Sequence, residues 1–156
     1  MSETRVFACF DVGHDTDLYE RLVAESGTAG LGITVSGGSE PFVFTDDWSE
    51  RARRAIRGAE RVFVICGEHT DGSLGVEAEL RIAREEQKPY LLLWGRRNSM
   101  CTKPAGAKPA EGMYAWTSPT LQEQLAVMTR VAQREHEANA MRRTAQVRVA
   151  SHASTP

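Results

Sequence analysis

Residues 61–94 read "RVFVICGEHTDGSLGVEAELRIAREEQKPYLLLW", and this stretch decides the fold. Two almost continuous apolar runs, 61–66 and 89–94, flank a segment of helical periodicity at 75–87. Such short apolar runs are typical of strands that are covered on both faces. A strand, a helix and a second strand in this order predict a βαβ unit with parallel strands and a right-handed crossover.

The same alternation extends toward the N-terminus. Further strand-like runs occupy 5–10 and 31–35, and helical periodicity occupies 15–26 and 47–58. We therefore expect an α/β fold in which a parallel sheet of four to five strands has helices on both faces.

The regular pattern stops after Trp94. Residues 95–117 are rich in Gly, Pro and Lys, which predicts a long loop with a short edge strand near 114–116. Spaced apolar residues then predict one amphipathic helix at about 119–142. We expect a single domain at 1–142, followed by a disordered tail at 143–156.

Composition excludes several classes of protein. The chain has 156 residues and a formal net charge of -2, so no general attraction to nucleic acid or membrane surfaces is expected. No apolar run approaches the roughly 18–20 residues of a membrane span, and the first residues lack the layout of a signal peptide. The three cysteines lack metal-ligand spacing, which predicts buried reduced thiols, no metal site and a cytoplasmic protein.

Three polar loops follow the first three predicted strands. They lie at 11–15, 36–48 and 67–75 and are rich in Gly, Ser, Asp and His. Ligands of parallel α/β sheets bind beyond the carboxyl ends of the strands, where such loops converge. These loops are the candidate site, although the same composition also suits ordinary turns.

One carboxylate has an unusual place in the helical pattern. At about 100° per residue, Glu79 falls within the apolar arc, between Ile82 and Ala83. Glu77 falls on the opposite, solvated side. Glu79 either lies at the edge of the apolar stripe and complements the helix dipole, or it is enclosed, with a shifted pKa and a chemical role.

Several motifs, in consecutive order, resemble the bacterial TIR-like family that includes Thoeris defence proteins. Phe-Asp ends the first strand (10–11), Gly-x-x-Thr follows the third (67–70), and Gly-Val-x-x-Glu (75–79) leads into Lys-Pro. The resemblance covers roughly residues 4–95. It implies a flavodoxin-like fold.

The resemblance also implies a chemistry. Many members cleave NAD⁺ between nicotinamide and ribose, and Thoeris members make a cyclic or modified ADP-ribose signal for a separate effector protein in antiphage defence. The family's catalytic glutamate maps onto Glu79, while Gly75 stands where many members have Trp. NAD⁺ is then the substrate, no cofactor or metal is required, and the active form is expected to be a homo-oligomer.

The converging loops supply candidate substrate contacts. Each of these residues could equally have an ordinary structural role in its loop. The stretch "SGGS" at 36–39 is not a phosphate-loop motif, and a lone loop histidine is more often structural. The candidates are Phe10, Asp11, Ser36, His69 and Thr70.

Two alternatives remain at the level of sequence. The segment 73–89 is also similar to the part of nucleoside deoxyribosyltransferases in which a glutamate attacks the sugar, and Asp71 supplies the acidic residue that usually precedes it. The second alternative is a catalytically silent domain that self-associates through its sheet edge or the helix at 119–142.

Overall fold

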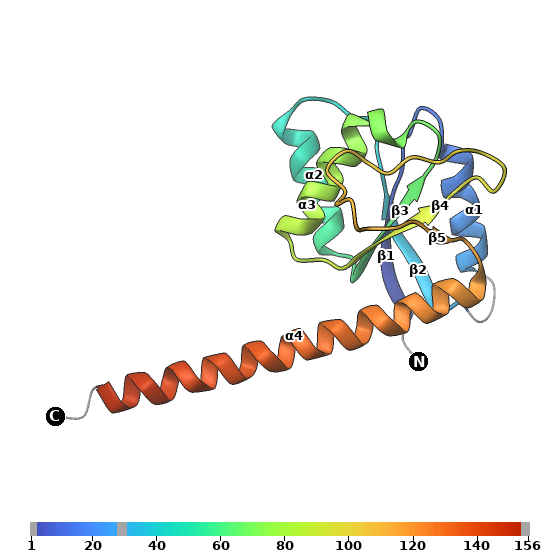
Figure 1. Cartoon of the computed structure of the whole chain (residues 1–156). Helices are drawn as coiled ribbons and strands as arrows, with labels where there is room; N and C mark the ends of the chain where they lie inside the picture. Colours follow the sequence, from blue (N-terminus) through green and yellow to red (C-terminus); the bar gives the residue numbers. More distant parts are fainter. Residues whose placement is uncertain (1–2, 28–30, 154–156) are drawn as a thin grey trace. The chain divides into compact units, whose positions relative to one another are not determined.

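A computed structural model describes residues 3–27 and 31–153 of the chain. Five parallel strands form one sheet in the order β2-β1-β3-β4-β5, with helices on both faces (Figure 1). This strand order is that of the flavodoxin-like doubly wound fold, so the predicted fold class is confirmed. In chain order the elements are β1 (Thr4–Cys9), α1 (Thr16–Ser26), β2 (Ile33–Gly38), α2 (Asp46–Arg57), β3 (Arg61–Cys66), the 3₁₀ turn η1 (Thr70–Gly72), α3 (Leu74–Glu85), β4 (Tyr90–Trp94), β5 (Tyr114–Ala115) and α4 (Ser118–Ala153).

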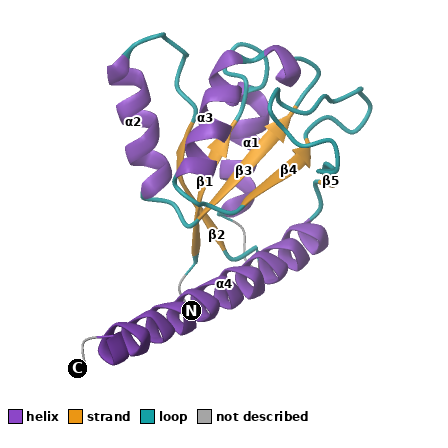
Figure 2. Cartoon of the chain, turned by 60° about the vertical axis from the view of Figure 1, so that its left-hand side comes forward, coloured by secondary structure: helices purple, strands orange, loops and turns teal. Residues whose placement is uncertain are grey.

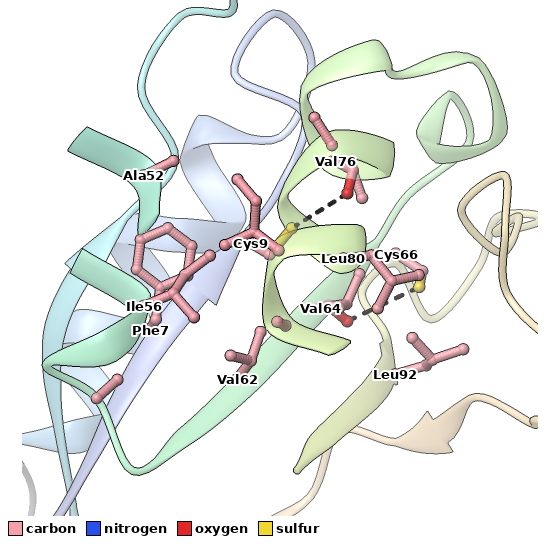
Figure 3. Close-up of a cluster of buried hydrophobic side chains, with 14 of the residues drawn as sticks. Phe7, Cys9, Ala52, Ile56, Val62, Val64, Cys66, Val76, Leu80 and Leu92 are labelled. Carbon is pink, nitrogen blue, oxygen red and sulfur yellow. Dashed lines mark hydrogen bonds between the residues drawn. The ribbon is translucent and has the colours of Figure 1, made fainter. Parts of the chain in front are cut away.

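The central strand β3 is buried on both faces, as its apolar run predicts. Val62, Val64 and Cys66 join a core cluster with side chains of α2 and α3 (Figure 3). The alternate residues Phe63 and Ile65 are equally buried, and the period of two places them on the opposite face. Burying each such side chain stabilises the fold by about 1.5–3 kcal/mol.

Side-chain caps fix where the two helices next to the candidate site begin. The Thr45 hydroxyl accepts a hydrogen bond from the Trp48 N–H (3.2 Å) at the start of α2, and Ser73 accepts from the Val76 N–H (3.4 Å) at the start of α3. Such caps contribute about 1 kcal/mol each. Because Ser73 sets the first turn of α3, it also sets the direction of Glu79 on the second.

All three cysteines are free and buried, as predicted. The Cys9 thiol points toward α3 and contacts the Val76 carbonyl oxygen (Figure 3). Burial raises the pKa of Cys66 to about 12 and that of Cys9 well above its ordinary value. Both thiols are therefore protonated at neutral pH.

The C-terminal third agrees with the prediction at the edge strand and differs from it in the length of the last helix. The short edge strand is present as β5, at the opposite sheet edge from β2 (Figure 2). Helix α4 continues to Ala153, where a disordered tail was expected from 143, because 143–153 contains neither Gly nor Pro to end it. Residues 154–156 lie outside the described residues.

Two compact units make up the chain, where the sequence predicts one domain at 1–142. The first covers Met1–Gln122 and contains the whole sheet, and the second covers Glu123–Pro156 and consists of most of α4. Most residues of α4 with described side chains are exposed. Among the described helices, none combines the length and the apolar character needed to cross a membrane.

Candidate functional site

Glu79 is enclosed, which decides between the two interpretations of its place in the helical pattern. Its side chain is 1% exposed. Oε1 accepts a hydrogen bond from the Ser39 hydroxyl (2.6 Å) and a weaker one from the Cys9 thiol (3.5 Å). Oε2 is buried and has no hydrogen-bond partner among the described residues. A buried carboxyl oxygen without a partner is costly, so this arrangement is not that of a surface helix residue.

Ser39 joins three elements at the carboxyl end of the sheet. Ser39 follows β2. Its hydroxyl oxygen accepts a hydrogen bond from the N–H of Phe10, after β1 (2.9 Å), and the hydroxyl donates a hydrogen bond to Glu79 on α3. The hydroxyl therefore uses both its donor and one acceptor position, and it fixes the position of Oε1.

Ser39→Ala is expected to lower the free energy of unfolding by about 1–3 kcal/mol, because the Phe10 N–H and Glu79 Oε1 both lose this partner. Urea unfolding at constant pH measures the change. Ser36→Ala is the matched control three residues earlier, within β2, since the Ser36 hydroxyl makes only a 3.4 Å contact with a backbone carbonyl. Equal losses for the two variants would contradict the role given to Ser39.

The environment of Glu79 raises its pKa to about 8. Burial is the main cause, with a small further increase from the negative charge of Glu40. The hydrogen bonds from Ser39 and Cys9 act in the opposite direction, but they do not offset the burial. The carboxyl group is therefore mostly protonated at neutral pH, and a nearby cation would favour its ionised form.

Glu79 lines a cavity of about 410 Å³ at the carboxyl ends of β1, β2 and β3. The other walls come from three loop segments, 10–13, 39–42 and 72–75. This volume is in the range of small-molecule sites. The lining includes the acidic residues Asp11, Glu40 and Glu79 and no Lys, Arg or His, which favours the positively charged part of a ligand.

An aromatic wall of the cavity comes from the loop after β2. A Cβ atom on Gly75 would lie 3.2 Å from Cβ of Phe42, so the absence of a side chain at 75 makes room for the phenylalanine. The Phe42 ring is held edge-on by Phe44 and Trp48, at centroid distances of 4.6 and 4.7 Å. Phe42 thus supplies an aromatic wall of the cavity beside Gly75.

The structure brings together only part of the predicted site. Phe10 and Asp11 line the cavity with Glu79, as expected from the convergence of the loops. Sequence reasoning missed Ser39 and Phe42 as neighbours of Glu79. The signal that could have indicated Phe42 is the glycine at 75, because a missing side chain there allows another segment to approach the helix closely.

Three other predicted contacts do not line this cavity. Ser36 bonds to the backbone of β1. Thr70 is fully buried, and its hydroxyl accepts the N–H of Gly67 (2.8 Å), which stabilises the turn before α3. His69 is exposed and stacks on His14 at a centroid distance of 4.0 Å. Their predicted roles in substrate binding have no support from the cavity lining.

Within 3–27 and 31–153, no group of three or more His, Cys, Asp and Glu side chains is placed so that it could hold a metal ion.

Comparison with known proteins adds little about function. No protein-family model matches the chain, and no curated protein is significantly similar to it. One similar solved structure is a crystal structure of a prokaryotic SEFIR domain. It is 18% identical in sequence, the match covers 82% of this chain and 97% of that one, and the TM-score is 0.45. At this level of similarity, any function has to be argued from the site itself.

Proposed function

We propose that this protein cleaves the bond between nicotinamide and ribose in NAD⁺, with Glu79 as the catalytic carboxylate. The observation that carries the proposal is the placement of Glu79. It is a buried carboxyl group with one unpartnered oxygen, in the wall of an acidic cavity at the carboxyl ends of the strands.

The reaction matches the charge of this cavity. When the bond between the ribose carbon and the nicotinamide nitrogen breaks, its electron pair stays with the nitrogen, so nicotinamide leaves as a neutral molecule. Positive charge then develops on the ribose ring, where a carboxylate stabilises it, as in glycoside cleavage. Water or a hydroxyl group then forms the new bond to the ribose carbon, and its proton passes to Glu79 or to solvent.

The nicotinamide ring of NAD⁺ is a planar cation, and the cavity offers partners for both properties. Asp11 supplies negative charge, and Glu40 adds to it although its carboxylate is also paired with Arg51 (3.1 Å). Phe42 supplies an aromatic face of the kind on which a cationic ring packs. A bound cation also lowers the pKa of Glu79 toward its ordinary value, so the substrate itself favours the ionised, active form of the carboxyl group.

The product is proposed from the resemblance of the 67–89 segment to TIR-like defence proteins. On that basis the ADP-ribose part becomes a cyclic or otherwise modified signal in antiphage defence, sensed by a separate effector. We further propose that the enzyme acts as a homo-oligomer in the cytoplasm.

The rate of NAD⁺ cleavage is expected to rise with pH. Only the ionised form of Glu79 stabilises the developing charge, and its pKa in the free protein is about 8. A plot of kcat/KM against pH, which reports groups of the free enzyme, should therefore increase toward a plateau above about pH 8. A flat profile between pH 6 and 9 would contradict this assignment.

A deoxyribosyltransferase activity is the second candidate, and one observation disfavours it. Asp71, its expected second carboxylate, is exposed and hydrogen-bonded to Thr102 rather than part of the cavity lining. Glu79 alone would have to attack the sugar and do the work of the second carboxylate.

Parallel incubations of the full chain with NAD⁺ and with a deoxynucleoside distinguish these functions. Chromatography should show nicotinamide released from NAD⁺, while the deoxynucleoside stays intact and the intact protein mass is unchanged. A stable increase in mass by one deoxyribosyl group would overturn the NAD⁺ proposal. Activity toward neither substrate would favour a silent self-association domain.

A further inference from the structure

A second cavity, separate from that of Glu79, is lined by positively charged rather than negatively charged side chains. It measures about 510 Å³ and lies between α1, the carboxyl end of β4 and the segment around β5. It shares no lining residue with the cavity of Glu79. Two tryptophans and two arginines line it, and no Asp or Glu does: Trp94, Trp116, Arg21 and Arg97.

The aromatic walls of this cavity are held in place. Glu25 on α1 accepts hydrogen bonds from Trp116 Nε1 and from Arg21 Nε, both at 2.8 Å. The Arg21 guanidinium lies 4.1 Å from the centre of the Trp116 ring. Trp94 Nε1 donates to the carbonyl oxygen of Arg96 (2.7 Å). Both indole N–H groups are therefore satisfied by the protein.

The positive charge of this cavity is not fully neutralised by the protein. Arg21 is paired with Glu25. Arg97, in contrast, is exposed and makes no hydrogen bond or ion pair with any other residue of the described parts of the chain. A guanidinium in this state is available to a phosphate, which it can bind through two parallel N–H groups.

We propose that this cavity, defined by Trp94, Trp116, Arg21 and Arg97, is a second ligand site, for a nucleoside monophosphate. The base packs against Trp94, which is partly exposed, whereas the Trp116 ring is buried and already carries the Arg21 guanidinium on one face. The phosphate binds Arg97. The site differs in charge from the cavity of Glu79, and the inference does not rest on NAD⁺ cleavage. A ligand bound here bridges α1 and the β4–β5 edge.

The test is a titration of the full chain with adenosine 5′-monophosphate, followed by NMR of the three tryptophan indole N–H groups. Single Trp→Phe variants assign the signals. Trp94 and Trp116 should shift saturably, with a Kd below about 1 mM. Trp48, which contacts Phe42 beside the other cavity, should not move. Adenosine and inorganic phosphate, titrated separately, should each bind at least about tenfold more weakly.

Arg97→Gln should weaken binding of this monophosphate by about tenfold, since a charge-assisted contact is lost. Arg54→Gln, a change at an exposed arginine of α2, is the matched control and should bind as the wild type does. Three results would each overturn the proposal: no saturable shift at about 5 mM, a shift confined to Trp48, or undiminished binding by Arg97→Gln.

Discussion

Glu79→Gln is expected to lower the rate of nicotinamide release from NAD⁺ by about a hundredfold to a thousandfold. Glutamine has the same shape and can still accept the hydrogen bond from Ser39, but it lacks the negative charge that stabilises the ribosyl cation. The measurement is chromatography of nicotinamide at saturating NAD⁺ and equal protein concentration.

Glu77→Gln is the matched control for this result. It makes the same chemical change two residues earlier on α3, where the side chain is exposed. The rate should stay within about twofold of the wild type, as expected for a surface substitution. If Glu79→Gln kept more than a tenth of the wild-type rate, the catalytic role would have to move to another carboxylate of the cavity, Asp11 or Glu40.

The second large effect is on stability, and it is independent of any substrate. The pKa of Glu79 is about 8 in the folded protein and about 4.5 in a model peptide. Between these values the folded state binds more protons than the unfolded state. The free energy of unfolding therefore falls as pH rises from about 4.5 to about 8.

Glu79→Gln removes this titration, so the variant should gain stability relative to the wild type as pH rises. The gain in the free energy of unfolding by pH 8 is on the order of several kcal/mol, since each unit of difference between the folded and unfolded pKa is worth about 1.36 kcal/mol. Melting curves of both proteins at pH 5 and pH 8 measure it. The difference in Tm, variant minus wild type, should increase by at least about 5 °C. A constant difference would mean that Glu79 titrates normally.

The fold was predictable because its signals are local. The apolar runs at 61–66 and 89–94 and the helical pattern between them lie within one βαβ unit, and such units predict parallel strands with right-handed crossovers. The place of Glu79 in the apolar arc was accessible for the same reason, but helical geometry left open whether its side chain lies at the edge of the stripe or is buried, as the structure shows it to be.

The neighbours of Glu79 could not be predicted from the sequence in the same way. Ser39 reaches it across 40 residues of sequence, and the contact depends on how β2 ends relative to α3. The packing of Phe42 against Gly75 likewise depends on the path of the loop after β2. Thr70 shows the reverse case, in which a polar loop residue near the site serves the backbone of its own turn.

The most direct test of the central claim is the titration of the Glu79 carboxyl group by ¹³C NMR. Glutamate labelled at the side-chain carboxyl carbon is used, and Glu79→Gln identifies the signal. The pKa of Glu79 should be near 8 in the free protein and should fall when carba-NAD, an analogue that cannot release nicotinamide in this way, is added. A pKa that starts near 4.5, or one that does not change with the analogue, would contradict an enclosed carboxylate that meets the cationic end of NAD⁺.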